Sequence, residues 1–395
     1  MARHPVRLIV EDDLHRSRLT VLLRLILAIP HFLWWNVWSI LAFFLAIVIW
    51  VVTLIRGAPP VGLYTLQASY IRYTTHFFAY LFLAANPWPM FTGRPGYPID
   101  LEFDPPQRQR RLTVAFRLIL AVPALLLAVC FTGGGVFTYG GGIILTVAFF
   151  AWFACLVRGR MPSGFRDLQA YSVRYAAQLF AYLLVLTERY PDVDPASTPA
   201  VGVEHPVWLA LEADLRRSRL TVFFRLLFSL PHLVWLVLWT VVALPLSFVT
   251  WITALAIGRP PRVLHRFLAA WIRYSTHLYA YITLAANPFP GFTGAGGSYP
   301  VDPVFPAPER QHRLLTGFRI FLAFPALAVN GAVGLLIIVS AFLGWFAALA
   351  LGRMPASLWA AQAYALRYSA QVSAYVFLLT GRYPYSGAIR IPSRS

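Results

Sequence analysis

Long apolar runs separated by short clusters of charge make up most of the chain. Residues 25–55 contain no acidic or basic side chain apart from one histidine, and similar runs start near residues 118, 226 and 320. One α-helix over residues 25–55 would be about 46 Å long, whereas the hydrocarbon core of a bilayer is about 30 Å thick. We therefore expect a hairpin of two short transmembrane helices in each run, which gives an all-α polytopic protein with about eight crossings.

The pattern of charge predicts how these hairpins lie in the membrane. We place their tips near Trp35 and Asn36 in the first run and within the glycine-rich residues 131–142 in the second. The tips carry no charge, whereas arginines crowd the opposite ends. By the positive-inside rule every hairpin then enters from the cytoplasm and returns to it, so both termini are predicted to be cytoplasmic.

A third segment follows each run, after a Gly-x-x-Pro turn, with the pattern R-Y-x-x-[HQ]-x-x-A-Y. In the first copy Thr65, Ser69, Arg72, His76 and Tyr80 recur at helical intervals along one face. A third crossing per copy would turn alternate arginine clusters to the wrong side, and an arginine at the bilayer centre costs about 2.5 to 3.5 kcal/mol. We therefore expect an amphipathic helix at the inner interface.

Self-similarity shows that the chain consists of four copies of one unit. The first motif is R-L-x-x-x-[LF]-R followed by proline, and it occurs at Arg18/Arg24/Pro30, Arg111/Arg117/Pro123, Arg219/Arg225/Pro231 and Arg313/Arg319/Pro325. The turn occurs at Gly57/Pro60, Gly159/Pro162, Gly258/Pro261 and Gly352/Pro355. The third motif occurs at Arg72/His76/Tyr80, Arg174/Gln178/Tyr182, Arg273/His277/Tyr281 and Arg367/Gln371/Tyr375.

Two types of repeat alternate, because only the first and third copies carry Pro-His, a histidine in the third motif and the ending NP[WF]PxFTG. This order predicts repeats A1 (1–98) and B1 (99–190), a linker (191–204), repeats A2 (205–299) and B2 (300–384), and a C-terminal tail (385–395). The Pro, Asp, Ser and Thr content of the linker predicts a solvent-exposed connection.

Short alternating runs before each first motif predict extended strands outside the bilayer: HPVRLIVE, YPIDLEF, HPVWLALE and YPVDPVF. Prolines at 303, 306 and 308 weaken the fourth strand. Four such strands are able to pair in one small sheet.

Composition agrees with a membrane protein, since 59% of the residues are hydrophobic, 12% are charged and the mean hydropathy is +0.64. All 33 basic residues are arginine, and the net charge is +18. A GC-rich genome and bidentate phosphate binding both explain the arginines. Because the basic clusters adjoin membrane segments, anionic lipids are the expected partner and nucleic acid is not. Cys130 and Cys155 lie in apolar segments and are expected to be small core residues.

The three motifs resemble an uncharacterised bacterial integral-membrane domain of unknown function that is often found in actinobacterial proteins, here in four tandem copies. The resemblance covers nearly the whole chain and implies a place in the bacterial plasma (inner) membrane, but it carries no activity with it.

The repeated arginines are the main candidates for a site that binds lipid headgroups or anions. These are Arg18, Arg24, Arg72, Arg111, Arg117, Arg174, Arg219, Arg225, Arg273, Arg313, Arg319 and Arg367. The alternative is that each arginine anchors its own helix, through headgroups or through carbonyls at a neighbouring helix end. A polar face is predicted from His31, His76, Tyr80, Gln178, Tyr182, His232, His277, Tyr281, Gln371 and Tyr375.

The histidine pairs His31/His76 and His232/His277 suggest a ligand site for haem or a metal ion. Local hydrogen bonding explains them more simply, and the same segments contain no acid or cysteine that would complete a site. No catalytic motif occurs. We expect no catalytic residue, metal or cofactor, and a non-enzymatic scaffold that engages anionic membrane lipids and associates with membrane proteins or with itself. The alternatives are a transporter or channel for an anionic solute or lipid, and a haem-binding redox protein.

Overall fold

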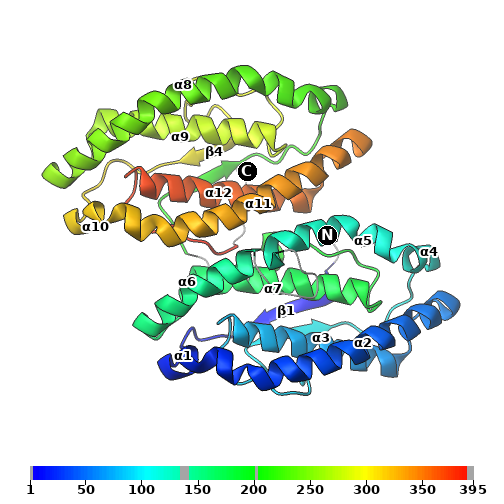
Figure 1. Ribbon diagram of the computed structural model, residues 1–395. Coiled ribbons are helices and arrows are strands. Elements are labelled where there is room, and N and C mark those ends of the chain that lie inside the picture. The colour runs from blue at the N-terminus through cyan, green and yellow to red at the C-terminus, as the bar shows by residue number, and fades with distance from the viewer. Residues whose placement is uncertain (1–2, 134–141, 201–202, 389–395) are drawn as a thin grey trace. The chain divides into compact units, whose positions relative to one another are not determined.

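The computed structural model describes residues 3–133, 142–200 and 203–388. The chain forms two compact halves, Met1–Val201 and Gly202–Ser395. Each half contains one A repeat and one B repeat, and the two halves are built from equivalent elements (Figure 1).

The first half has three layers. The outer layer consists of α1 (Arg18–Leu27), α2 (Ile29–Arg56), α4 (Arg111–Ala115), α5 (Arg117–Thr132) and α6 (Gly142–Arg158). The inner layer consists of α3 (Val61–Leu81) and α7 (Ser163–Leu183), which pack against each other, and the third layer is a sheet of β1 (Val6–Val10) and β2 (Ile99–Phe103). Helix α2 covers α3, while α5 and α6 cover α7; β1 contacts α7 and β2 contacts α3.

The second half repeats this arrangement. Its outer helices are α8 (Arg219–Ile257), α10 (Arg313–Gly317) and α11 (Arg319–Leu351). Its inner helices are α9 (Arg262–Ile282) and α12 (Ala356–Val376), and its strands are β3 (Trp208–Leu211) and β4 (Val301–Val304). A short 3-10 helix, Pro195–Ser197, lies in the segment predicted to be the linker.

The predicted hairpin is wrong in three of the four repeats, because the outer helix runs through the middle of the apolar run without a break. Helix α2 passes through Trp35 and Asn36, and the Asn36 amide donates to the carbonyl of Phe32 at 2.7 Å within the same helix. Helix α8 continues for 39 residues and α11 for 33 residues. Pro231, Pro245 and Pro325 each remove one backbone hydrogen bond, but the helices continue through them. A length greater than the bilayer thickness does not by itself break a helix.

In repeat B1 the predicted tip lies mostly outside the described residues. The interval from Arg117 to Gly159 is nine residues longer than the equivalent interval from Arg319 to Gly352. Gly142 starts α6 with φ +64°, and a Cβ there would lie 2.7 Å from the carbonyl oxygen of Cys130. Helix α6 therefore starts against the end of α5.

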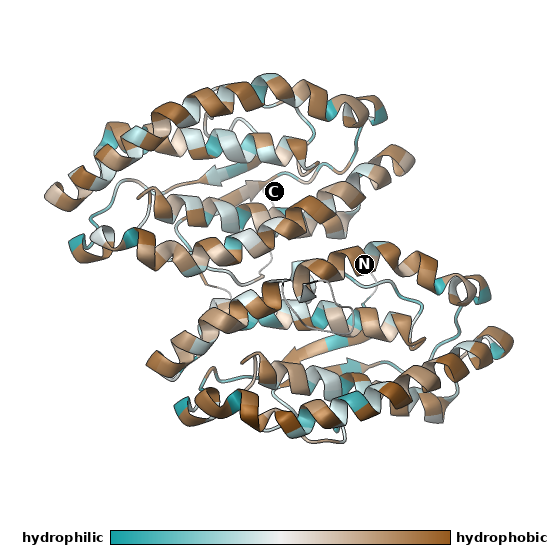
Figure 2. Ribbon diagram, in the orientation of Figure 1, coloured by the Kyte–Doolittle hydropathy of each residue, from teal (hydrophilic) through white to brown (hydrophobic). Residues whose placement is uncertain are grey.

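Three helices in the described part of the chain are long and apolar enough to cross a membrane: α2, α8 and α11. Their presence is compatible with a membrane protein. Most of the ribbon of the long outer helices is hydrophobic (Figure 2).

The predicted strands form, but as two separate antiparallel pairs rather than one sheet. In the first pair Leu8 lies opposite Leu101, and in the second Leu209 lies opposite Pro303. The predicted weakness of the fourth strand is not borne out, since β4 contains Pro303. A two-stranded sheet leaves one edge of every strand unpaired, and proline is tolerated at such an edge.

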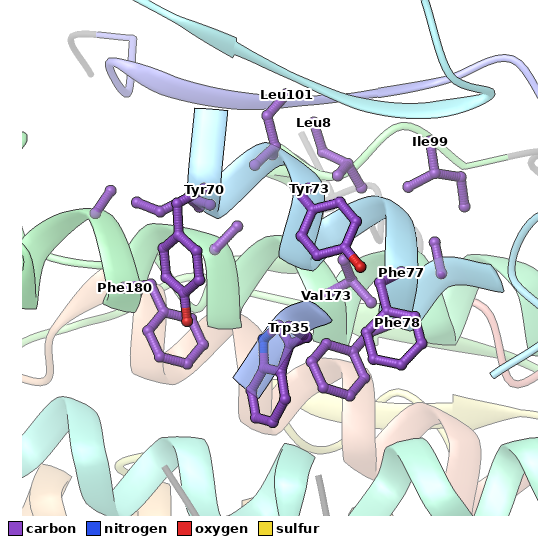
Figure 3. Packing of buried hydrophobic residues seen from close by; sticks show 14 of the residues in the cluster. Leu8, Trp35, Tyr70, Tyr73, Phe77, Phe78, Ile99, Leu101, Val173 and Phe180 are labelled. Carbon is purple, nitrogen blue, oxygen red and sulfur yellow. The ribbon is translucent and has the colours of Figure 1, made fainter. Parts of the chain in front are cut away.

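The inner helices pack between the outer helices and the sheet, and their place at a membrane interface stays a prediction. Nearly every residue of α7 is buried, as are two thirds of the residues of α12. In the first half Leu8, Ile99 and Leu101 reach toward α3 from the strands, and Trp35 approaches from the outer side (Figure 3). The polar face of α3 finds its partners in the chain that covers it, so it needs no headgroup layer.

The segment predicted to be a solvent-exposed linker is partly buried. Val193, Pro195 and Thr198 are buried. The Arg174 guanidinium donates to the Thr198 hydroxyl and to the carbonyl of Asp194, both at 2.8 Å. Arg174 thus holds the segment to α7. The composition of the segment gives no sign of this contact.

Candidate functional site

The second arginine of the first motif is buried in every repeat. Arg24 is only 2% exposed, and its guanidinium donates to the carbonyls of Tyr80 at 2.6 Å and Ala85 at 3.1 Å. The equivalent arginines bind equivalent carbonyls: Arg117 those of Tyr182 and Thr187, Arg225 those of Tyr281 and Ala286, and Arg319 those of Tyr375 and Thr380. The first carbonyl of each pair lies in the last turn of the inner helix, and the second lies in the turn that follows the helix, where the regular helical hydrogen bonds end.

The last tyrosine of the third motif lies against the same arginine. The Arg24 guanidinium carbon is 4.4 Å from the centre of the Tyr80 ring, and the other three repeats have this contact at 4.3 to 4.7 Å. Cation–π contact and helix capping therefore join the two motifs. The guanidiniums of these four arginines are thus engaged in contacts within the protein.

A second cap, absent from the sequence predictions, stabilises the turn after each inner helix. Leu83, Val185, Leu284 and Leu378 have positive φ angles between 64° and 69°, a conformation that is strained for these residues. In each repeat the side chain two positions before the first motif donates to the carbonyl of this residue. The pairs are Arg16 with Leu83, Gln109 with Val185, Arg217 with Leu284 and Gln311 with Leu378. The signal in the sequence is the arginine or glutamine at that fixed position in every repeat.

The first arginine of the first motif is exposed and joins two repeats. Arg18 donates to the carbonyl of Val157 at 2.9 Å, and Arg111 donates to that of Ile55 at 2.8 Å. Equivalent bonds join Arg219 to Ala350 and Arg313 to Ala256, both at 3.0 Å. Each repeat of a half thus caps the outer helix of the other, so the two outer helices run antiparallel and meet at both ends.

These end contacts gather exposed arginines into clusters. In the first half one cluster contains Arg18, Arg158 and Arg160, and the other contains Arg56, Arg110 and Arg111. Between the clusters the outer helices present large apolar side chains, among them Leu25 (75% exposed), Ile40 (62%) and Ile55 (67%). We call the exposed side chains of α1, α2, α4, α5, α6, α8, α10 and α11 the outer face.

The arginine of the third motif ties each inner helix to the chain that follows it. Arg72 donates to the carbonyl of Leu101 at 3.2 Å and pairs with Asp100 at 3.2 Å, and Arg273 pairs with Asp302 at 3.3 Å. Arg174 binds the segment after α7, as described above, and Arg367 donates to the carbonyl of Gly387 at 2.7 Å. The anchoring alternative accounts for these contacts, with backbone carbonyls in place of headgroups.

A hollow of about 420 Å³ lies beside Arg273 in repeat A2. Arg266 and Arg273 line it together with the loop that contains Gly294 and with Phe305. Two guanidiniums at one open hollow are suited to an anion, which keeps Arg273 among the candidate residues for headgroup binding.

The two histidines of each A repeat have separate partners. His31 Nδ1 lies 3.0 Å from the Tyr73 hydroxyl, and His232 makes the same contact with Tyr274 at 2.8 Å. His76 lies 2.9 Å from Asp100, and His277 lies 2.8 Å from Asp302. Within the described residues there is no group of three or more His, Cys, Asp or Glu side chains that could hold a metal ion.

Glutamine in the B repeats takes the place of the second histidine. Gln178 donates to the carbonyl of Val6 at 3.0 Å, and Gln371 donates to that of Val207 at 2.9 Å. In both repeat types this position of the inner helix therefore binds a strand or, for Gln371, the residue just before β3. The residues of the predicted polar face meet protein groups in the interior.

The hydrogen bond between His76 and Asp100 makes stability depend on pH. Burial lowers the pKa of His76 below its usual 6.5. Burial raises the pKa of Asp100, but hydrogen bonds from His76 and from the amide of Gly96 outweigh this effect, so that pKa falls below its usual value. Both lowered pKa values agree with a neutral His76 imidazole that donates to an ionised Asp100 carboxylate.

We expect the folded protein to lose stability as the pH falls below about 6.5, because the unfolded chain then takes up a proton that folded His76 resists. His76→Gln introduces the residue of the B repeats and removes this contribution. Thermal unfolding between pH 7.5 and 5.5 measures it: the decrease in stability should be smaller in the variant. An identical pH dependence in both proteins would contradict the assignment.

A close backbone contact fixes the loop that follows each inner helix of an A repeat. Gly294 has φ +59°, and a Cβ there would lie 2.1 Å from the carbonyl oxygen of Ala270 on α9. We expect Gly294→Ala to cost about 2 kcal/mol or more of unfolding free energy, since backbone must move and the conformation is strained. Gly291→Ala is the matched control, because nothing lies within 4 Å of a Cβ there. Equal unfolding temperatures for the two variants would refute the contact.

A sequence model described as "Domain of unknown function (DUF4389)" matches four segments of the chain, residues 18–92, 111–192, 219–293 and 313–387. The four matches start at the first arginine of each first motif. No curated protein and no solved structure matches the chain.

Proposed function

Since the chain belongs to the DUF4389 family, a domain of unknown function present here in four copies, we propose that it is a non-enzymatic membrane scaffold that engages lipid. Its outer face contacts the hydrocarbon of the bilayer. Its exposed arginines bind anionic headgroups.

The observation that carries this proposal is the exposure of the outer face. Leu25, Ile40 and Ile55 are more than 60% exposed, as are Leu226 and Ile338 in the second half. Soluble monomers rarely present contiguous apolar patches of more than a few hundred Å² to water. Lipid removes this surface from water and needs no further protein.

The placement of the arginines limits which of them can meet lipid. The guanidiniums of Arg24, Arg117, Arg225 and Arg319 are occupied by helix-end carbonyls, so we assign headgroup contact to the exposed quartet Arg18, Arg111, Arg219 and Arg313 and to the neighbouring cluster residues. Each arginine near an anionic membrane surface contributes about 1 kcal/mol to membrane binding. The location that suits this chemistry is the cytoplasmic leaflet of a bacterial plasma membrane, with both termini in the cytoplasm.

Reconstitution into liposomes tests the proposal against transport. We expect the purified protein to float with vesicles, to prefer those that contain phosphatidylglycerol over pure phosphatidylcholine, and to show no anion flux above empty vesicles. Sustained flux that disappears in Arg72→Ala and Arg273→Ala would overturn the scaffold in favour of a transporter or channel.

A further inference from the structure

The length of the outer helices limits how they can meet a bilayer. Helix α8 has 39 residues, which corresponds to about 58 Å at 1.5 Å per residue. Crossing a hydrocarbon core of about 30 Å would need a tilt of about 60°, whereas helices that span a membrane tilt by 0 to about 40°. Helices α1 and α2 together cover the same length, with a single intervening residue at Ala28.

Apolar exposure continues along this whole length. In the first half it begins at Leu19, which is 66% exposed, and continues to Ile55, which is 67% exposed. A spanning helix would pass from hydrocarbon into water at each end. The observed surface instead resembles that of a helix lying in a membrane interface with one face in lipid.

The sheet would enter the bilayer if the outer helices crossed it. Strands β1 and β2 pack over the inner helices, which lie beneath the middle of α2 near Trp35 (Figure 3). This layer carries Arg7, which pairs with Glu102 at 3.0 Å and with Asp104 at 2.7 Å. Lipid-exposed sheet edges do not occur in hydrocarbon, so these groups need the aqueous side.

The positions of the arginines also favour an arrangement with both clusters on the same side of the membrane. Because the antiparallel outer helices meet at both ends, arginine clusters lie at both ends of each pair, about 57 Å apart along Arg18 to Arg56. A spanning orientation would put one cluster on the outer side, against the positive-inside rule. A helix pair parallel to the membrane keeps both clusters at the same headgroup layer.

We propose that the outer helices of each half lie in the plane of the membrane, with the outer face buried in a single leaflet of anionic lipid and the sheet on the aqueous side. The proposal rests on the lipid-engaging function above and adds its geometry. The protein occupies one leaflet without crossing the bilayer.

Cysteine labelling from one side of the membrane tests this geometry. His15 precedes α1, and Arg56 ends α2, and both are exposed. The single variants His15→Cys and Arg56→Cys of the full chain are expressed in bacterial cells and treated with a membrane-impermeant maleimide before and after permeabilisation. Wild type is the matched control, since Cys130 and Cys155 are buried.

We expect both variants to be protected in intact cells and labelled after permeabilisation. Labelling of only one variant in intact cells would overturn the in-plane arrangement. Labelling of both in intact cells would support the arrangement and overturn the cytoplasmic side given under the proposed function.

Depth measurements separate the in-plane helix from one that dips to the bilayer centre. A fluorophore is attached at Leu19→Cys, Ile40→Cys and Ile55→Cys, and its quenching by brominated lipids is measured. We expect all three within about 10 Å of the headgroup boundary. Ile40 at the bilayer midplane would overturn the proposal, whereas loss of the preference for phosphatidylglycerol at unchanged depth would overturn only the assigned lipid.

Discussion

Replacing Arg24 with methionine should destabilise the first half more than any exposed substitution. The change removes two charge-assisted hydrogen bonds to the carbonyls of Tyr80 and Ala85 and the cation–π contact with the Tyr80 ring. Bonds to charged groups are worth about 1.5 to 3 kcal/mol each, so we expect a loss of about 3 kcal/mol or more. In a half of this size that corresponds to a decrease of about 6 to 12 °C in the unfolding temperature.

Thermal unfolding in detergent measures this effect, and Arg18→Met is the matched control. Both variants remove one guanidinium from α1, but Arg18 is exposed and makes one bond, to Val157. We expect the control to change the unfolding free energy by about 1 kcal/mol or less. Similar decreases in the two proteins would show that the cap on α3 is not the source of the stability.

The second large effect concerns lipid selection by the exposed quartet, Arg18, Arg111, Arg219 and Arg313. Replacing all four with glutamine should abolish enrichment of anionic lipid around the protein. Each arginine contributes about 1 kcal/mol, or roughly fivefold, near the surface. Mass spectrometry of the lipid that remains bound after purification gives the ratio of phosphatidylglycerol to phosphatidylcholine.

Lysine at the same four positions is the control, because it keeps the charge and loses the planar fork. We expect the lysine variant to retain most of the enrichment and the glutamine variant to approach the ratio in the bulk lipid. Equal enrichment in the glutamine variant and in wild type would place the anionic lipid elsewhere, with Arg266 and Arg273 at the hollow in repeat A2 as the next residues to change.

The sequence was sufficient to predict what depends on local pattern. The four repeats follow from Arg18, Arg111, Arg219 and Arg313 and the motifs that they start, and they are confirmed by the family match. The alternation in HPVRLIVE and its equivalents predicts the four strands, which form. The apolar runs are helical, as expected.

The rest depended on contacts that only the fold creates. The break predicted at Trp35 and Asn36 follows from bilayer thickness. This thickness limits the length of a helix only if the helix spans the membrane. The motif allows Arg24 to bind either phosphate or helix-end carbonyls, and it does not show that the partners are the carbonyls of Tyr80 and Ala85, more than fifty residues away. One signal was available: the interval from Arg24 to Tyr80 recurs unchanged from Arg225 to Tyr281 and from Arg319 to Tyr375.

The most direct test of the account is whether the outer face touches hydrocarbon while the sheet touches water. Spin labels at Ile40→Cys on α2 and at Glu102→Cys on β2, both exposed positions, are compared in liposomes for collision with oxygen and with a water-soluble nickel chelate. We predict that the label at Ile40 collides with oxygen and not with nickel, and that the label at Glu102 does the reverse. Free access of nickel to Ile40 would contradict the account.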